Sequence, residues 1–539
     1  MPIPQGLPDD AATVFCCTVY DMHTEVSGFA EGAGLGTQAP SFGALEHVRE
    51  RPVVHARDPR FGAFPMSLGL DVLRAHGADV SRGVVFGHNY TSAERCRSDG
   101  YFYPPNLTPD PATDFAVALQ AVAATRPGET ALTLPLQPGM ERYLRERGVL
   151  IANANILEVN PHVAPGEQVR LGWPFTDIVT LAAKDNSLPF GVPVVLSLPT
   201  ESAGGLCARR GGAFVQRSSA SMTNNKVQFQ LDAERFGYTP VRGFVIDSVS
   251  DLTPCASAFS GASRVWVKHA TAAGGDAVIR VDGPITLEKL LGARERLHQL
   301  EEQTLAATGF RREGLAHVPQ ALVVQLDAGC DPREPSHPRT VRTIGGALFR
   351  VSADGGVEIH SYHEQDTDAA GVFYGSKPFY PAPEVRRLID AEIQAVGRYC
   401  AEELSLFGNV GIDIVVTEDD RGRVSVELIE LNGRPNATTL SRIVAEAVDA
   451  PCWQQVTVKS ERPLDTFEDV AGLLGAETLE PGDTGPRFVV LGLSSLYRIN
   501  PSGERELLYS SNSAKVLVIG KTEEQVRQGL QRIAEVKAR

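Results

Sequence analysis

Apolar positions along this chain follow two periods, one typical of strands and one typical of helices. Between Thr286 and Leu305, leucines recur mostly three or four residues apart, and the interval from Glu384 to Leu406 repeats apolar residues in the same way. Each interval therefore predicts an amphipathic helix. Further helices are predicted at 226–236 and 439–448, and strands at 241–246, 264–267, 321–326, 341–351 and 357–360. This mixture predicts an α/β protein.

The flanking segments are also mixed. Strands are predicted at 53–55, 83–86, 130–134 and 194–198, with helices at 115–124 and 140–146; near the other end, strands are predicted at 488–493, 507–510 and 516–519. A final helix opens at Thr522, where Gln525 completes a capping box. We therefore expect three domains. An α/β domain covers 1–215, a central domain covers 216–455 with lobes at 216–325 and 326–455, and a small α+β lobe covers 456–539.

The most specific local pattern is a predicted hairpin of two apolar strands joined by the acidic, glycine-containing turn 417–422. Asp413 lies in its first strand, and Glu430 and Asn432 lie in its second. Because side chains alternate along a strand, Glu430 and Asn432 share a face, whereas Glu427 is predicted on the opposite face and is excluded as a ligand. Pairing of the strands would place Asp413 beside them. Two carboxylates and an amide oxygen are hard ligands that suit magnesium bound to nucleotide phosphates.

Composition narrows the class of protein. With 539 residues, 42% hydrophobic and 22% charged, the chain is typical of a soluble globular protein of several domains. A net charge of −15 argues against a general nucleic-acid binder. The apolar runs are too short to span a membrane, and the first residues lack the pattern of a secretion signal, so we expect a cytoplasmic protein without membrane partners. The eight cysteines form no C-x-x-C pair, which favours buried free thiols.

The acidic hairpin resembles the metal-binding hairpin of the ATP-grasp superfamily. The resemblance implies a fold of two α+β lobes that clamp ATP, preceded by an α/β pre-ATP-grasp domain and followed by the small C-terminal lobe. It also implies that Asp413, Glu430 and Asn432 bind one or two Mg²⁺ ions, with Mn²⁺ as an alternative. No P-loop pattern is present, which agrees with nucleotide held between lobes.

Other segments occur in the order that this family would have. Lys226 begins a helix that is followed by Gly237 and Pro240, and Lys268 ends a strand before Gly274 and Gly275. The resemblance implies that both lysines approach phosphates and that the glycines form a lid. It further implies that the segment Gln325, Leu326 and Asp327 holds adenine through main-chain groups, with Asp327 as a candidate for the ribose.

A looser resemblance concerns the segment from Asp354 to Pro381, which is similar to the pheganomycin-type peptide ligases. It implies that His363 and Gln365 line the acyl or amine site. The family also uses arginines against the transferred phosphate, and Arg342 or Arg350 is expected in that role, with the choice open. Arg434 follows the hairpin and presents a planar guanidinium suited to phosphate or carboxylate.

The resemblance implies an ATP-dependent carboxylate–amine ligase of small-molecule or peptide biosynthesis. Such an enzyme activates an acid as an acyl phosphate, joins it to an amine or peptide, and releases ADP and phosphate. Two alternatives stay open: a nucleotide-binding regulator without catalysis, and an ATP-grasp enzyme with an acceptor other than an amine. A homodimer would be compatible with each of them.

Overall fold

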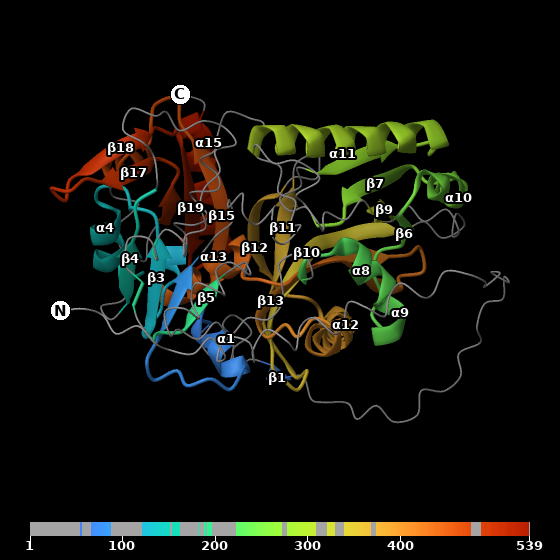
Figure 1. The fold of residues 1–539 in the computed structure, drawn as a ribbon, viewed down its shortest axis with the longest axis horizontal. Helices are drawn as coiled ribbons and strands as arrows, with labels where there is room; N and C mark the ends of the chain where they lie inside the picture. The colour runs from blue at the N-terminus through green and yellow to red at the C-terminus, as the bar shows by residue number, and fades with distance from the viewer. Residues whose placement is uncertain are drawn as a thin grey trace, which may run out of the picture. The chain divides into compact units, whose positions relative to one another are not determined.

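The computed structural model of the protein describes residues 54–55, 66–87, 121–150, 154–161, 182, 188–189, 191–196, 223–271, 277–308, 321–328, 339–367, 373–475 and 487–537. It has the predicted α/β class, with helices packed on several sheets (Figure 1). Within the described residues, no helix is both long and apolar enough to cross a lipid bilayer.

The largest sheet has nine strands in the order β14-β13-β10-β11-β12-β15-β19-β16, with β1 beside β11. The strands are β1 (Val54–His55), β10 (Thr340–Val351), β11 (Val357–Thr367), β12 (Phe373–Phe379), β13 (Gly408–Glu418), β14 (Val424–Asn432), β15 (Cys452–Lys459), β16 (Arg487–Leu493) and β19 (Ser513–Gly520). The strands on the main path pair antiparallel, and β1 pairs parallel with β11. The C-terminal strands therefore continue the sheet that contains the acidic hairpin, and the expected domain boundary after residue 455 falls inside β15.

A second, antiparallel sheet has the order β6-β9-β7-β8. It comprises β6 (Gly243–Ile246), β7 (Arg264–His269), β8 (Val278–Asp282) and β9 (Leu322–Leu326), with helices α8 (Lys226–Leu231), α9 (Ala233–Phe236), the 3₁₀ turn η4 (Val249–Asp251), α10 (Leu252–Ala258) and α11 (Leu287–Thr308). Leu290 and Leu297 of α11 share a core cluster with Val265 and Val324 of the sheet, along which α11 runs (Figure 1). The helix expected over 226–236 is divided at Asp232 into α8 and α9, as suits a residue that prefers helix ends.

A third sheet, in the order β4-β3-β2-β5, is entirely parallel. Its strands are β2 (Val84–Gly87), β3 (Glu129–Thr133), β4 (Asn155–Glu158) and β5 (Val194–Leu196), and the helices nearby in sequence are α1 (Leu70–Ala75) and α4 (Met140–Glu146). Parallel strands are normally covered on both faces, which explains the apolar sequences of β2 and β5. The remaining elements are the hairpin β17 (Leu496–Ile499) and β18 (Arg505–Tyr509), and helices α12 (Pro383–Glu402), α13 (Ala437–Ala447), α14 (Phe467–Leu474) and α15 (Glu523–Lys537).

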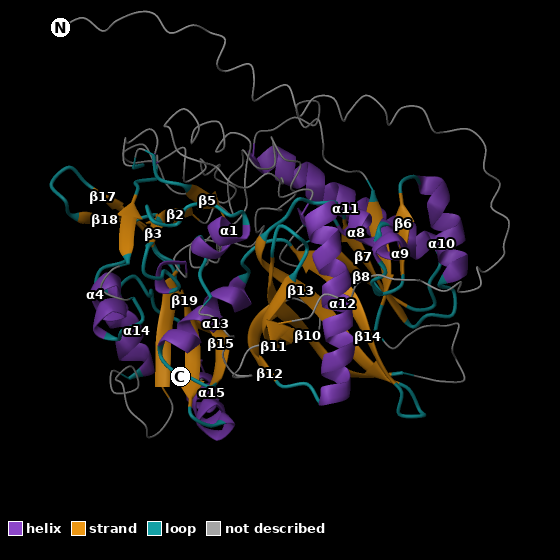
Figure 2. Cartoon of the chain, turned by 90° about the horizontal axis from the view of Figure 1, so that it is seen from below, coloured by secondary structure: helices purple, strands orange, loops and turns teal. Residues whose placement is uncertain are grey.

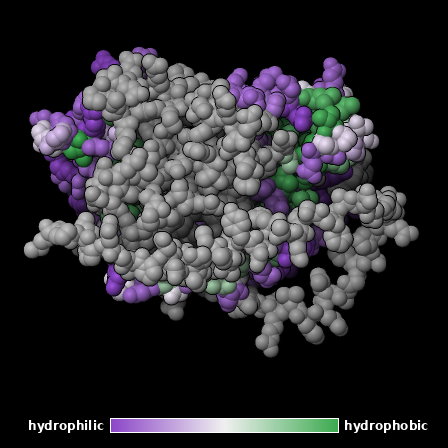
Figure 3. All heavy atoms as spheres, viewed as in Figure 1, coloured by the Kyte–Doolittle hydropathy of each residue, from purple (hydrophilic) through white to green (hydrophobic). Residues whose placement is uncertain are grey.

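Helix α12 covers one face of the hairpin strands and so determines which face carries polar chemistry (Figure 2). Ile389 and Ile393 of α12 belong to the same buried cluster as Ile412 and Ile414 of β13. Because side chains alternate along β13, Asp413 lies on the other face, toward the second sheet. On the surface, Figure 3 shows hydrophilic and apolar side chains side by side, with apolar ones gathered where α10 and the end of α11 lie.

Candidate active site

The predicted hairpin is present, and its register brings the three expected metal ligands together. Asp413 of β13 lies directly opposite Glu430 of β14, and Asn432 lies opposite Gly411, two residues along from Asp413. The Nδ2 of Asn432 donates to Oδ2 of Asp413 at 3.2 Å. Three oxygen-bearing side chains therefore gather on one face of the hairpin.

A β-bulge in β14 changes which face the neighbouring residues occupy. The pairing passes from Asp413 with Glu430 to Ile414 with Leu428, so Ile429 is an extra residue in this strand. An extra residue reverses the alternation beyond it. Glu427, which pairs with Val415, consequently shares the face of Glu430. The alternation argument that excluded Glu427 was wrong, because it assumed a regular strand.

Two lysines from the second sheet's lobe approach these carboxylates. The Nζ of Lys226 lies 3.2 Å from Oε2 of Glu430, and the Lys226 side chain is only 7% exposed. Lys226 is the first residue of α8, and the side chain of Asn225 caps this helix. The backbone N–H of Lys226 donates to the carbonyl of Ala270, which follows β7. Lys268, near the end of β7, is also buried. The structure thus brings both predicted phosphate-binding lysines toward the acidic hairpin.

The charges in this cluster influence one another strongly. Burial, and next the Glu430 carboxylate, raises the pKa of Asp413 to about 7. Burial also acts to raise the pKa of Glu430, but the combined attraction of Lys226, Lys268 and Arg434 outweighs it and holds that pKa below its usual value. Burial lowers the pKa of Lys268. Of the two carboxylates, Glu430 therefore ionises more readily, and a cation on this face would favour ionisation of Asp413 as well.

The expected adenine segment lies at the end of β9, next to the hairpin. Gln325 Nε2 donates to the carbonyl of Ile429 at 3.2 Å, so this residue links the two lobes. The backbone N–H groups of Leu326 and Asp327 donate to other carbonyls. The Asp327 carboxylate accepts from Trp266 Nε1 at 2.7 Å and pairs with Arg264 at 3.3 Å. A ribose contact by Asp327 would have to compete with these partners. Gly274 and Gly275 lie outside the described residues.

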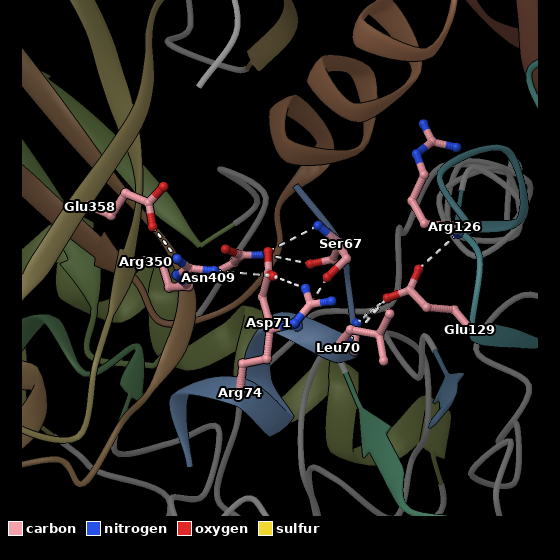
Figure 4. A network of polar contacts seen from close by, with 10 residues as sticks. Ser67, Leu70, Asp71, Arg74, Arg126, Glu129, Arg350, Glu358 and Asn409 are labelled. Atoms are coloured by element: carbon pink, nitrogen blue, oxygen red, sulfur yellow. Dashed lines mark hydrogen bonds and ion pairs between the residues drawn. The ribbon is translucent and has the colours of Figure 1, made fainter. Parts of the chain in front are cut away.

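The three candidate arginines are placed differently. Arg434 is buried just beyond Asn432, and its charge acts on Glu430. Arg342 is instead an exposed residue paired with Glu418, at 2.8 Å, near the turn of the hairpin. Arg350 contacts Glu358 and Asp71 in a separate polar network (Figure 4).

Distances along β10 explain this separation. Gly346 is the β10 residue opposite Asp413, and Arg342 and Arg350 each lie four residues from it, which is about 13 Å along a strand. Of the three arginines, the structure brings only Arg434 close to Asp413, Glu430 and Asn432.

His363 and Gln365 lie within β11, not in a loop. His363 pairs with Gly346 in the neighbouring strand, and burial lowers its pKa to about 3. Gln365 extends over β10, where its Nε2 donates to Oδ1 of Asp413 at 2.7 Å. The sequence carries no signal for this contact, because the two residues are separated by a whole intervening strand.

The donor set fits a hard divalent cation. Within the described part of the chain, no three His, Cys, Asp or Glu side chains gather as a metal site, so Asn432 is needed as the third donor beside Asp413 and Glu430. Its Nδ2 is directed to Asp413, which leaves its Oδ1 for a cation. Two carboxylates and one amide oxygen, completed by water or phosphate oxygens, are the kind of ligands that Mg²⁺ accepts.

No protein-family model and no curated protein matches the sequence. Among solved structures, the biotin carboxylase domain of 2-oxoglutarate carboxylase from Hydrogenobacter thermophilus is similar, with 13% identity, coverage of 84% of this chain and 89% of that chain, and a TM-score of 0.44. Carboxyaminoimidazole ribonucleotide synthase from Aspergillus clavatus has 10% identity, coverage of 85% and 99%, and a TM-score of 0.44. Phosphoribosylamine–glycine ligase from Thermotoga maritima has 13% identity, coverage of 84% and 96%, and a TM-score of 0.41. Similarities at this level do not by themselves establish a family or a reaction.

Proposed function

We propose that the protein is an ATP-dependent carboxylate–amine ligase of the ATP-grasp type. The observation that carries the proposal is the meeting of two kinds of group from two lobes. Asp413, Glu430 and Asn432 form a cation-binding face on the hairpin, and Lys226 of the other lobe already contacts Glu430. A metal–nucleotide complex needs this combination, because the cation neutralises phosphate oxygens on one side and the lysines do so on the other.

A ligase of this kind requires a nucleotide because an amine that attacked a free carboxylate would have to expel an oxide ion, which is a very poor leaving group. The carboxylate oxygen attacks the γ-phosphorus of ATP, ADP leaves, and an acyl phosphate results. The amine nitrogen then attacks the acyl carbon, inorganic phosphate leaves, and the nitrogen loses a proton. When bound, Mg²⁺ or Mn²⁺ supplies the positive charge that phosphoryl transfer needs.

The chain's own residues mainly bind and orient the reactants. Lys226 and Lys268 would meet phosphate oxygens, and Arg434 is the arginine suited to the transferred phosphate, since Arg342 and Arg350 lie about 13 Å along β10 from the residue opposite Asp413. Gln325, whose Nε2 links β9 to the carbonyl of Ile429, would flank the adenine. Buried lysines interact more strongly with phosphate than exposed ones, because water screens them less.

The proposal is tested by following product formation with a surrogate amine. The protein would be incubated with ATP, Mg²⁺, hydroxylamine and each of a panel of amino acids and short peptides, and ADP, phosphate and hydroxamates would be measured. We expect hydroxamate and ADP in equal amounts with at least one acid. Release of AMP and pyrophosphate would contradict the acyl-phosphate route, and ADP binding without turnover over the whole panel would favour the nucleotide-binding regulator.

The matched variant is Glu430→Gln, which keeps the side-chain shape and removes the ionised metal ligand. We expect turnover to fall by about a hundred- to a thousandfold, as with the loss of other preorganised electrostatic contacts, while circular dichroism stays that of the wild type. Turnover within a few-fold of wild type would show that Glu430 does not hold the cation.

A further inference from the structure

Asp413 is held by two neutral donors that come from opposite sides. Asn432 Nδ2 donates to Oδ2, and Gln365 Nε2 donates to Oδ1, at 3.2 and 2.7 Å. One hydrogen bond to each oxygen fixes the plane of the carboxylate. Each oxygen can still accept a second bond from another direction. Asn432 was expected at this place from the hairpin pattern, whereas Gln365 belongs to a strand two positions away in the sheet.

Gly346 makes room in β10 for the ring of His363, which lies two residues before Gln365 in β11. It is the residue of the intervening strand β10 that pairs with both Asp413 and His363. A Cβ atom at this position would lie 2.5 Å from the carbonyl oxygen of Ile412 and 2.7 Å from the ring of His363. Only glycine fits there, because any side chain would clash with the buried His363 ring that covers β10 at this point.

We infer that Gln365 is a positioning residue, which holds the Asp413 carboxylate in the orientation that binds the divalent cation. This inference rests on the proposed function, because it requires a cation at Asp413. It gives Gln365 a different task from the contact with acyl or amine substrate that the sequence suggested.

The choice of an amide at position 365 has a physical reason. A lysine or arginine would hold Asp413 equally well, but its charge would neutralise the carboxylate and compete with the cation. An amide orients the carboxylate and leaves its charge available. The adjacent His363 adds no charge either, because its buried ring stays neutral above a pKa of about 3.

The test measures cation binding directly, with Mn²⁺ as the probe and ADP present, by the electron paramagnetic resonance signal of free Mn²⁺. Gln365→Met keeps the length of the side chain and removes the donor. Loss of a residue that orients a metal ligand typically weakens metal binding by about ten- to a hundredfold, and we expect the dissociation constant for Mn²⁺ to rise by at least tenfold.

The control is Gln454→Met, which removes a comparable amide–carboxylate contact in the same sheet. Gln454 Nε2 donates to Asp366 Oδ2 at 2.5 Å, away from the candidate ligands. We expect this variant to bind Mn²⁺ as the wild type does, even if both variants melt at a lower temperature. Should Gln365→Met fail to fold, Gln365→Asn can replace it. Asparagine keeps the amide but is one methylene too short to reach Asp413, and its Mn²⁺ affinity is measured in the same way.

The outcomes are distinct. Equal Mn²⁺ affinity in wild type and Gln365→Met would overturn the positioning role and leave the proposed function intact. An equal loss in Gln365→Met and Gln454→Met would also overturn it, because the loss would then reflect general loosening of the sheet. If the wild type itself binds no Mn²⁺ with ADP present, the proposed function fails and this inference fails with it.

Discussion

Lys226→Met should bind Mn²⁺ more tightly than the wild type when nucleotide is absent. The ammonium of Lys226 lies 3.2 Å from Oε2 of Glu430, and so occupies the side of that carboxylate where a cation would bind. A metal ion that binds Oε2 of Glu430 from this side must displace the ammonium. Methionine fills similar space without the charge, so the replacement removes this competition.

The expected size of the effect follows from the strength of the contact. A hydrogen bond between charged groups contributes on the order of 1.5–3 kcal/mol, and both partners are largely buried, with side chains 7% and 24% exposed. Since about 1.4 kcal/mol corresponds to a tenfold change in binding, Mn²⁺ affinity should rise roughly ten- to a hundredfold. Affinity for ATP should fall, because a phosphate contact is lost.

The assay is an electron paramagnetic resonance titration of nucleotide-free protein with Mn²⁺ at pH 8, repeated with ADP. Lys521→Met is the control, since Lys521 forms an exposed pair with Asp449 at 2.9 Å, away from the site. We expect no change in its Mn²⁺ binding. Unchanged or weaker Mn²⁺ binding by Lys226→Met without nucleotide would refute the idea that the lysine and the metal compete for Glu430.

Three further outcomes concern stability. Glu129→Ala should cost on the order of 3 kcal/mol in urea unfolding, because it leaves two buried backbone N–H groups and one partly buried one without their acceptor; a cost below about 1 kcal/mol would contradict this. Arg350→Met should cost on the order of 3 kcal/mol, because Asp71 and Glu358 lose their shared cation, and ADP affinity should not change. Burial lowers the pKa of His269 to about 3, so between pH 6.5 and 3 only the unfolded state takes up this proton and stability falls with falling pH; His269→Asn should reduce that slope.

The sequence was sufficient to predict the hairpin and to name its acids, but not their register. Continued from the turn without interruption, the pairing of Ile414 with Leu428 would place Asp413 opposite Ile429, and the bulge is what brings Asp413 opposite Glu430. The helix over 384–406 was equally accessible, since its apolar stripe is long and regular; it is found as α12. These features depend on residues close together in the chain.

Features that depend on distant strands could not be predicted in this way. The order of strands in the sheet decides that Gln365 meets Asp413, and nothing in either segment encodes that order. The bulge at Ile429 lacks a glycine or proline to signal it, so the faces beyond it were assigned incorrectly for Glu427. Arg350 was expected to bind phosphate because its actual partner, Asp71, could not be recognised from the sequence. Asp71 lies 279 residues earlier in the chain.

The position of β14 at the edge of the sheet also has a consequence for how the protein can vary. Leu428 accepts from the backbone N–H of Val241 and donates its own N–H to the carbonyl of Thr239, at 2.7 and 2.8 Å. Main-chain atoms thus join β14 to the segment that precedes β6. Such a joint tolerates exchange of the surface side chains around it, but not a change in the number of residues between Gly237 and Gly243. Related chains should therefore have no insertion between the residues that correspond to Gly237 and Gly243, even where the amino acids in that connection differ.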